Sequence, residues 1–200
     1  MELDEFKKRL NELREIIVEA IAYLSAWYEI ANLNEEEAHA LNRYRGFFLP
    51  VQLSLKQMAL LQLAKIFDKD QRTSSLHSLL DATKDNPNLV TPHAEEQELR
   101  QLETKMAENE ELLSHLKIYR DQRLAHHDST ILGDTSLTYG QIKQLVEDIK
   151  DIYNSLSRGY ERSITSFDSI SSGASKDASG VKLIMVEERE RARKKYTNPL

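Results

Sequence analysis

The chain has 200 residues, of which 40% are hydrophobic and 30% charged, with 6 glycines and 4 prolines, and this balance is typical of an all-α protein of one domain with an appendage. The formal net charge of −6 excludes binding nucleic acid by bulk attraction, so any RNA contact must come from a local cluster of cations. The absence of cysteine excludes disulfides, cysteine-based zinc sites and a thiol nucleophile.

The first predicted helix spans residues 3–31, because apolar residues recur there at alternating steps of three and four. The acidic stretch 1–5 opens this helical pattern and does not have the character of a signal peptide. No apolar run in the chain approaches the ~18 residues of a membrane span. We therefore expect a cytoplasmic protein. The expected stripe consists of Leu3, Phe6, Leu10, Leu13, Ile17, Ala20, Leu24, Trp27 and Ala31.

A second helix is expected to begin at Asn34, because an asparagine followed by three glutamates is typical of a helix cap. Between Phe47 and Phe67 this helix is apolar almost all round, which predicts a central, buried element. Pro50 lies within it and should either kink the helix or split it in two.

The next stretch, residues 68–75, is polar and predicts a turn, after which Ser74 or Ser75 caps a short helix. Residues 85–88 are expected to form a loop. Thr91-Pro92 then predicts the start of a long helix that runs to about His127, since proline favours the first helical position.

A break at Gly133-Asp134 separates that helix from the last predicted helix of the bundle, which Thr138 caps. Its apolar stripe consists of Ile142, Leu145, Ile149, Ile152, Leu156 and Tyr160. These elements together predict a four- to five-helix up-down bundle over residues 1–165.

The composition changes after the predicted bundle. Residues 166–180 are rich in serine, glycine, alanine and aspartate, which indicates a flexible linker. In the C-terminal segment 181–200, residues 181–186 are expected to form a short strand or an apolar docking segment, and the charged residues 187–195 a helix.

The segment Tyr119–Asp128 carries the chemistry. It places two arginines, two histidines and a carboxylate near the end of the long helix. Such a set supplies what phosphodiester cleavage needs without a metal: a permanent cation for the phosphate and a proton carrier that titrates near neutrality. The alternative interpretation is a solvated helix end, where cations favour the negative end of the helix dipole.

Helix geometry alone bears on which of the two histidines lies on the face of Arg120. Arg120 and His127 are seven residues apart, about 20° from eclipsed on a straight helix. Arg123 and His127 form an i, i+4 pair. Spacing therefore favours His127 over His126.

The segment resembles the signature of HEPN-domain proteins, an arginine followed a few residues later by a histidine. Here Arg120-Asp121 precedes Leu124-Ala125-His126, with five residues between the arginine and the histidine. The AbiU-type branch, found in phage-defence and toxin-like settings, is resembled most closely. That likeness rests also on residues 67–76 and on His127-Asp128, and it covers residues 1–165. Asp121 departs from the pattern, since many family members have asparagine there.

The resemblance implies a homodimer whose two Arg-His motifs line a shared cleft and cleave RNA without a metal or cofactor. His126 would move protons, with His127 as second candidate, and Arg120 would clamp the phosphate. Asp121 would orient a catalytic side chain. Arg123, Lys117 and Tyr119 would contact the RNA. An antitoxin protein is a further expected partner.

Two other functions stay open at this point. The first is a non-catalytic helical module that binds RNA, a nucleotide or a protein partner through the same residues. The second, weaker one is a metal-dependent hydrolase. His77, His93 and His115 have no spacing typical of a zinc site and are expected to face solvent.

Overall fold

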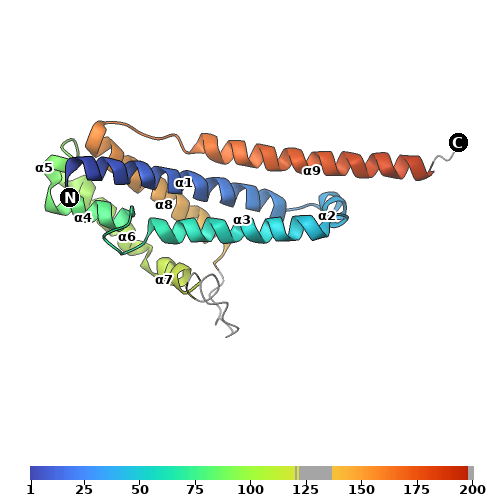
Figure 1. Ribbon diagram of the computed structural model, residues 1–200, viewed down its shortest axis with the longest axis horizontal. Coiled ribbons are helices and arrows are strands. Elements are labelled where there is room, and N and C mark those ends of the chain that lie inside the picture. Colours follow the sequence, from blue (N-terminus) through green and yellow to red (C-terminus); the bar gives the residue numbers. More distant parts are fainter. Residues whose placement is uncertain (120, 122–136, 198–200) are drawn as a thin grey trace. The chain divides into compact units, whose positions relative to one another are not determined.

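The computed structural model describes residues 1–119, 121 and 137–197, with side chains up to residue 195. Within these ranges the chain forms nine helices and no strand, which confirms the predicted all-α class (Figure 1). The helices are α1 (Leu3–Ala31), α2 (Glu35–Asn42), α3 (Arg45–Ile66), α4 (Leu76–Asp85), α5 (Pro87–Val90), α6 (Glu96–Glu108), α7 (Glu110–Tyr119), α8 (Tyr139–Glu161) and α9 (Asp168–Thr197).

The chain divides into two compact units. The first unit comprises Met1–Ala20 and Leu60–Phe167, and the second comprises Ile21–Ala59 and Asp168–Leu200. In the described part of the chain no single helix is both long and apolar enough to cross a membrane. The bent pair of α1 and α2 reaches that length and apolar content only when the two helices are counted together.

The core of the first unit is built from the predicted stripes of α1 and α8. Phe6 and Leu13 of α1 are fully buried, as are the apolar seam positions of α8. The rings of Phe6 and Tyr160 lie 5.6 Å apart. The largest fully buried side chains, all in this unit, are Phe6, Leu13, Ile17, Leu63, Ile66, Leu76, Leu79, Leu116, Ile142, Leu145, Ile149 and Ile152.

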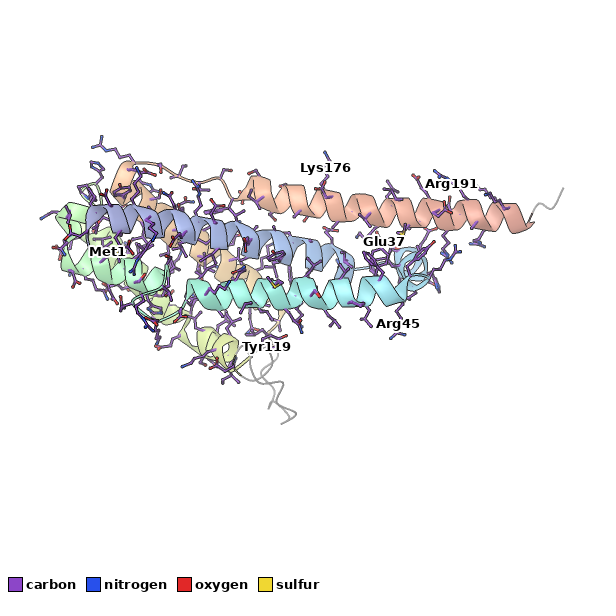
Figure 2. All side chains as sticks on the ribbon, viewed as in Figure 1. Met1, Glu37, Arg45, Tyr119, Lys176 and Arg191 are labelled. Carbon is purple, nitrogen blue, oxygen red and sulfur yellow. The ribbon has the colours of Figure 1, made fainter. Side chains whose placement is uncertain are left out.

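The second unit has a small apolar core and a buried amine. Ala178 of α9 packs with Ile30 and Leu41. One turn further on, Lys182 is buried, and its Nζ lies 3.2 Å from a carboxylate oxygen of Glu29 and 3.3 Å from one of Glu37. This pairing joins α9 to α1 and α2, and Glu37 lies on the side of α2 that faces α9 (Figure 2).

Three of the predicted caps are confirmed. The side chains of Asn34, Ser75 and Thr138 each accept a hydrogen bond from the third residue of the helix that follows, at 2.9, 3.2 and 3.3 Å respectively. Between Ser74 and Ser75, the two candidates for the cap of α4, the structure selects Ser75. Each such cap satisfies an otherwise unpaired backbone N–H.

The predicted second helix is wrong in two respects. The helix is split at residues 43–44, between α2 and α3. The split is not at Pro50, which lies inside α3. The first half of α3 is also not buried, since Phe47 is 65% and Leu53 52% exposed. Most residues of α3 are buried only from Ala59 onward, and the first unit begins at the next residue, Leu60.

Thr91-Pro92 does not begin the long helix. Residues 87–90, half of them in the expected loop, form the short helix α5, and the next helix begins at Glu96. The intervening turn is held by other bonds: the Thr91 hydroxyl donates to the Pro87 carbonyl at 3.2 Å, and the His93 N–H donates to the Gly159 carbonyl at 2.9 Å.

The long helix itself is interrupted at Asn109, between α6 and α7. The Asn109 side-chain amide donates to the Lys105 carbonyl at 2.9 Å and to Asp148 Oδ2 of α8 at 3.0 Å. The side chain therefore replaces a backbone donor at the break and ties it to α8. The predicted break at Gly133-Asp134 lies outside the described residues.

The secondary structure after residue 166 also differs from the prediction. In place of a linker over 166–180 and a strand or docking segment over 181–186, α9 runs without interruption from Asp168 to Thr197, and the helix expected at 187–195 is confirmed as part of it. Its inward positions recur every three or four residues, but several are small residues such as Ala174 and Ala178. Small residues give a weak hydrophobic signal, so composition concealed the helical period.

We predict that Lys182→Met lowers the free energy of unfolding by about 1–3 kcal/mol, because the two partly buried carboxylates of Glu29 and Glu37 lose the ammonium group that both contact. Urea denaturation followed by circular dichroism measures the change. The matched control is Lys176→Met on the same helix. The Lys176 side chain is exposed and points away from α9 (Figure 2), so this change should alter the free energy of unfolding little. Equal effects of the two variants would contradict the structural role of Lys182.

A second prediction concerns the contact of α8 with the turn before α6. A Cβ at Gly159 would lie 2.9 Å from the Ala94 Cβ and 3.2 Å from the Thr91 Cβ. We therefore expect Gly159→Ala to destabilise the protein by about 1–3 kcal/mol, as overpacking does.

The control for this variant is Gly140→Ala in the first turn of the same helix, where nothing lies within 4 Å of the added carbon. That change should stabilise the protein by up to ~1 kcal/mol through helix propensity. Thermal unfolding of both variants separates the outcomes, and a stabilised Gly159→Ala protein would contradict the close approach.

Candidate functional site

The helix that leads into the Arg-His segment is described, and the segment itself is largely not. Lys117 is exposed on the last turn of α7, Tyr119 ends this helix half-buried, and Asp121 follows it, also half-buried. Four predicted site residues lie outside the described residues: Arg120, Arg123, His126 and His127. The structure therefore describes the end of α7, which leads into the predicted motif, and not most of the motif itself.

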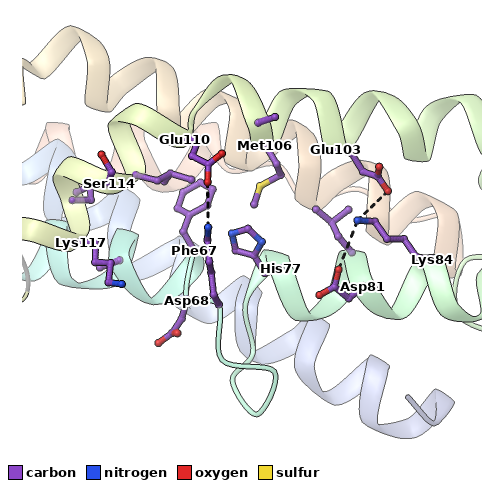
Figure 3. A pocket seen from close by; sticks show the side chains of 16 residues that line it. Phe67, Asp68, His77, Asp81, Lys84, Glu103, Met106, Glu110, Ser114 and Lys117 are labelled. Carbon is purple, nitrogen blue, oxygen red and sulfur yellow. Dashed lines mark hydrogen bonds and ion pairs between the residues drawn. The ribbon is translucent and has the colours of Figure 1, made fainter.

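The last turns of α7 border a pocket of about 470 Å³ within the first unit (Figure 3). Its walls come from the end of α3 with the start of the following turn, and from α4, α6 and α7. The pocket thus joins the turn after Phe67, on which the family resemblance partly rested, to the helix that precedes the Arg-His motif in sequence. The apolar residues that line it are Ala64, Phe67, Leu80, Met106, Ala107, Leu113 and Leu116.

The turn over residues 68–75 is held by its own side chains. The Asp70 N–H donates to Asp68 Oδ1 at 3.0 Å, and Arg72 Nη2 lies 2.6 Å from Asp70 Oδ2. The hydrogen bonds from Arg72 lower the pKa of the Asp70 carboxyl from its ordinary 3.8 to about 2. Arg9 of α1 donates to the Thr73 carbonyl at 3.3 Å and so fastens the turn to the first helix.

Two ion pairs cross the pocket. Lys69 Nζ lies 3.3 Å from Glu110 Oε1 at the start of α7. Lys84 Nζ lies 3.3 Å from Glu103 Oε1 on α6 and 3.7 Å from Asp81 Oδ1 on its own helix. Both lysines are about half to three-quarters exposed, so these pairs add little to the free energy of unfolding. Their main effect is to neutralise the two ammonium groups at these positions of the pocket.

Lys117 differs from the other two lysines of the pocket. Among the residues that the structure describes, its amine is in no ion pair, whereas Lys69 and Lys84 each have a carboxylate partner. The positive charge available in the pocket therefore lies at the end nearest Arg120 in sequence.

His77 is a pocket residue that the sequence reasoning missed. It was expected to face solvent, but it is half-buried on α4, and its Nε2 is buried without a hydrogen-bond partner in the described structure. Burial is the main cause that lowers the pKa of this imidazole below its ordinary 6.5, and the nearby Lys69 adds to it. Its spacing from Leu80, Asp81 and Lys84, which share one helical face, was the signal available in the sequence.

The other two histidines set aside as zinc ligands lie elsewhere. His93 is exposed in the turn before α6, and His115 on α7 is half-buried and does not line the pocket, so the expectation of solvent exposure is confirmed fully only for His93. Over residues 1–119 and 137–195, no three histidine, aspartate or glutamate side chains gather as metal ligands.

A family model described as AbiU2, of the HEPN type, matches residues 3–181. The match takes in both segments that border the pocket and the whole of the Tyr119–Asp128 segment, and it extends past residue 165 into α9. No curated protein and no solved structure matches the chain.

The lowered pKa of His77 predicts a neutral ring at pH 7. Because the unfolded chain takes up this proton at a higher pH than the folded chain, protonation favours unfolding. The free energy of unfolding should therefore fall as the pH drops below 6.5, and His77→Gln should remove that part of the decline. Imidazole resonances followed by NMR against pH provide the measurement. A pKa at or above 6.5 for His77 would contradict its placement.

Proposed function

The chain belongs to the HEPN AbiU2 family, and we therefore propose that it is a metal-independent endoribonuclease of the toxin or phage-defence type. The observation that carries this proposal is the Arg120-to-His126 spacing, present in a chain that matches this family over nearly its whole length. The proposed substrate is RNA, because the proposed chemistry uses the ribose 2′-hydroxyl as its nucleophile.

In the proposed reaction the 2′-hydroxyl attacks the adjacent phosphorus and the bond from phosphorus to the 5′-oxygen breaks. His126 removes the proton of the attacking hydroxyl or gives one to the leaving oxygen, and His127 is the second candidate for this role. The products are a 2′,3′-cyclic phosphate and a 5′-hydroxyl. Arg120 stabilises the charge that builds on the phosphate oxygens, with Arg123 as a second cation.

The site is proposed to form across a homodimer, so that two Arg-His motifs line one cleft. Lys117 and Tyr119 would then contact RNA at its edge. This arrangement suits the charge of the chain, because a formal net charge of −6 repels RNA except where cations gather locally. An antitoxin protein is the proposed partner that would keep such an activity in check.

A second candidate function rests on Asp121. A carboxylate directly after Arg120, where many family members have asparagine, reduces the positive charge that should stabilise the transition state of cleavage. This departure favours a module that binds RNA, a nucleotide or a protein without cleaving RNA. Tight RNA binding without cleavage by the purified protein would support this candidate. Asp121→Asn should then strengthen RNA binding.

We expect the purified protein to cleave total RNA in excess EDTA and to leave 2′,3′-cyclic phosphate ends. Arg120→Ala and His126→Ala should each reduce cleavage at least about 100-fold, the range for losing a general acid-base group or a charge-stabilising donor. His127→Ala tests the second candidate histidine directly. Product ends and rates are read by gel electrophoresis and end-group analysis.

Arg100→Ala and His39→Ala provide matched controls. Both side chains are exposed on other helices, at 72% and 58%, and both changes remove the same residue types. They should leave cleavage unchanged. If Arg120→Ala and His126→Ala cut RNA as fast as these controls, a contaminating nuclease explains the activity and the assignment fails. Activity that EDTA abolishes would favour a metal-dependent hydrolase.

A further inference from the structure

We propose that the pocket formed by Phe67, His77, Met106 and Lys117 binds one nucleobase of the RNA substrate and thereby sets the preferred cleavage site. This inference rests on the proposed function and adds to it a ligand class and specificity-determining residues. It uses only described residues of the first unit.

The size and lining of the pocket suit a base. Its volume of about 470 Å³ lies within the range of about 300–1,000 Å³ for small-molecule sites. Phe67 and Met106 are among the apolar residues that line the pocket, and Phe67 contributes an aromatic ring to this lining. Stacking on such side chains is the main way in which proteins hold single-stranded bases.

The charge distribution favours an uncharged base over a phosphate. Seven charged residues line the pocket: Asp68, Asp81, Glu103, Glu110, Lys69, Lys84 and Lys117. Because four are acidic and three basic, the formal sum is −1, which opposes an anion inside the pocket. Lys69 and Lys84 are already paired with carboxylates. The exposed amine of Lys117, which is in no ion pair with a described residue, then suits the phosphate that continues the RNA strand.

His77 gives the pocket a means of telling bases apart. Figure 3 shows its ring between the Glu110 end and the Lys84 end of the pocket. A neutral imidazole has one donor and one acceptor nitrogen, which matches the mixed edges that bases present. Its Nε2 is unpaired in the described structure, and burying such a group without a partner is unfavourable. A base that completes this hydrogen bond is favoured over one that cannot.

The position of the pocket in the chain fits this role. Lys117 and Ser114 line the pocket, and Arg120 follows Lys117 by three residues. Three residues span at most about 11 Å of chain, so we assign the bound base to a nucleotide close to the phosphate at which Arg120 is proposed to act.

The experiment uses the full-length protein and short RNAs that together contain every dinucleotide step, with kcat/KM measured at each step. The wild-type protein should prefer some steps over others. His77→Phe keeps a flat ring but removes the hydrogen bonds, and Met106→Trp fills the pocket. Each should lower the ratio between the best and the worst step at least about fivefold.

The matched control is Arg100→Ala, an exposed change on α6 outside the pocket, which should keep the wild-type preference. A second measurement needs no catalysis. The four nucleoside 5′-monophosphates are titrated into the His126→Ala protein, and the His77 imidazole resonances should shift with one base more than with the others. Met106→Trp in the same background should abolish this shift.

The outcomes separate the pocket from the nuclease. RNA cleavage that depends on Arg120 and His126, with the same base preference in the wild-type protein and in both pocket variants, overturns the base pocket and leaves the nuclease standing. A wild-type protein without any base preference also overturns it. Should Met106→Trp lose helicity by circular dichroism, His77→Phe and the nucleotide titration decide. If the wild-type protein cleaves no RNA, the proposed function and this inference fail together.

Discussion

The burial of Leu116 fixes the approach to the proposed active segment, and the rest of the site depends on it. Leu116 is 2% exposed and is the last buried residue of α7 before Lys117 and the Arg-His segment. Seven residues earlier, the Asn109 amide binds Asp148 of α8, so the helix is anchored near both ends. Ser114 and Lys117 of α7 line one pocket with residues of the turn after Phe67.

This anchoring also determines how charge is distributed. Glu110 pairs with a lysine of the turn before α4, and Glu103 pairs with a lysine of α4 itself. These carboxylates therefore offset the charge of two of the lysines that line the pocket. The same packing removes water from His77 and keeps its imidazole neutral at pH 7. A neutral hydrogen-bonding group inside the pocket and a cation at its mouth are what a base with its attached phosphate requires. In a chain with a net charge of −6, such local separation is how RNA can be held.

The sequence predicted the elements whose signals are local and strong. The stripes of α1 and α8 and the caps at Asn34 and Thr138 depend on neighbours within a few residues. Both caps are confirmed, and the stripes are confirmed from Phe6 to Leu24 and from Ile142 to Leu156. The breaks depend on distant partners. Thr91-Pro92 has the chemistry of a helix start, but the backbone of this turn bonds to Gly159 of α8, and Asn109 ends a helix because Asp148 receives its amide. In α9 small residues occupy several inward positions, so the composition of this segment concealed its helical period.

The candidate site divides in the same way. The Arg-His spacing is a local pattern, visible in ten residues of sequence, and the AbiU2 match supports the family that it indicated. The pocket is not local, since its walls come from residues 64–69, 77–84, 103–107 and 110–117. Nothing in the sequence states that His77 and Lys117 line one pocket, because this arrangement depends on how α4 and α6 pack. The proposed cleavage chemistry and the proposed base selection therefore depend on different residues, and a change in one set need not alter the other.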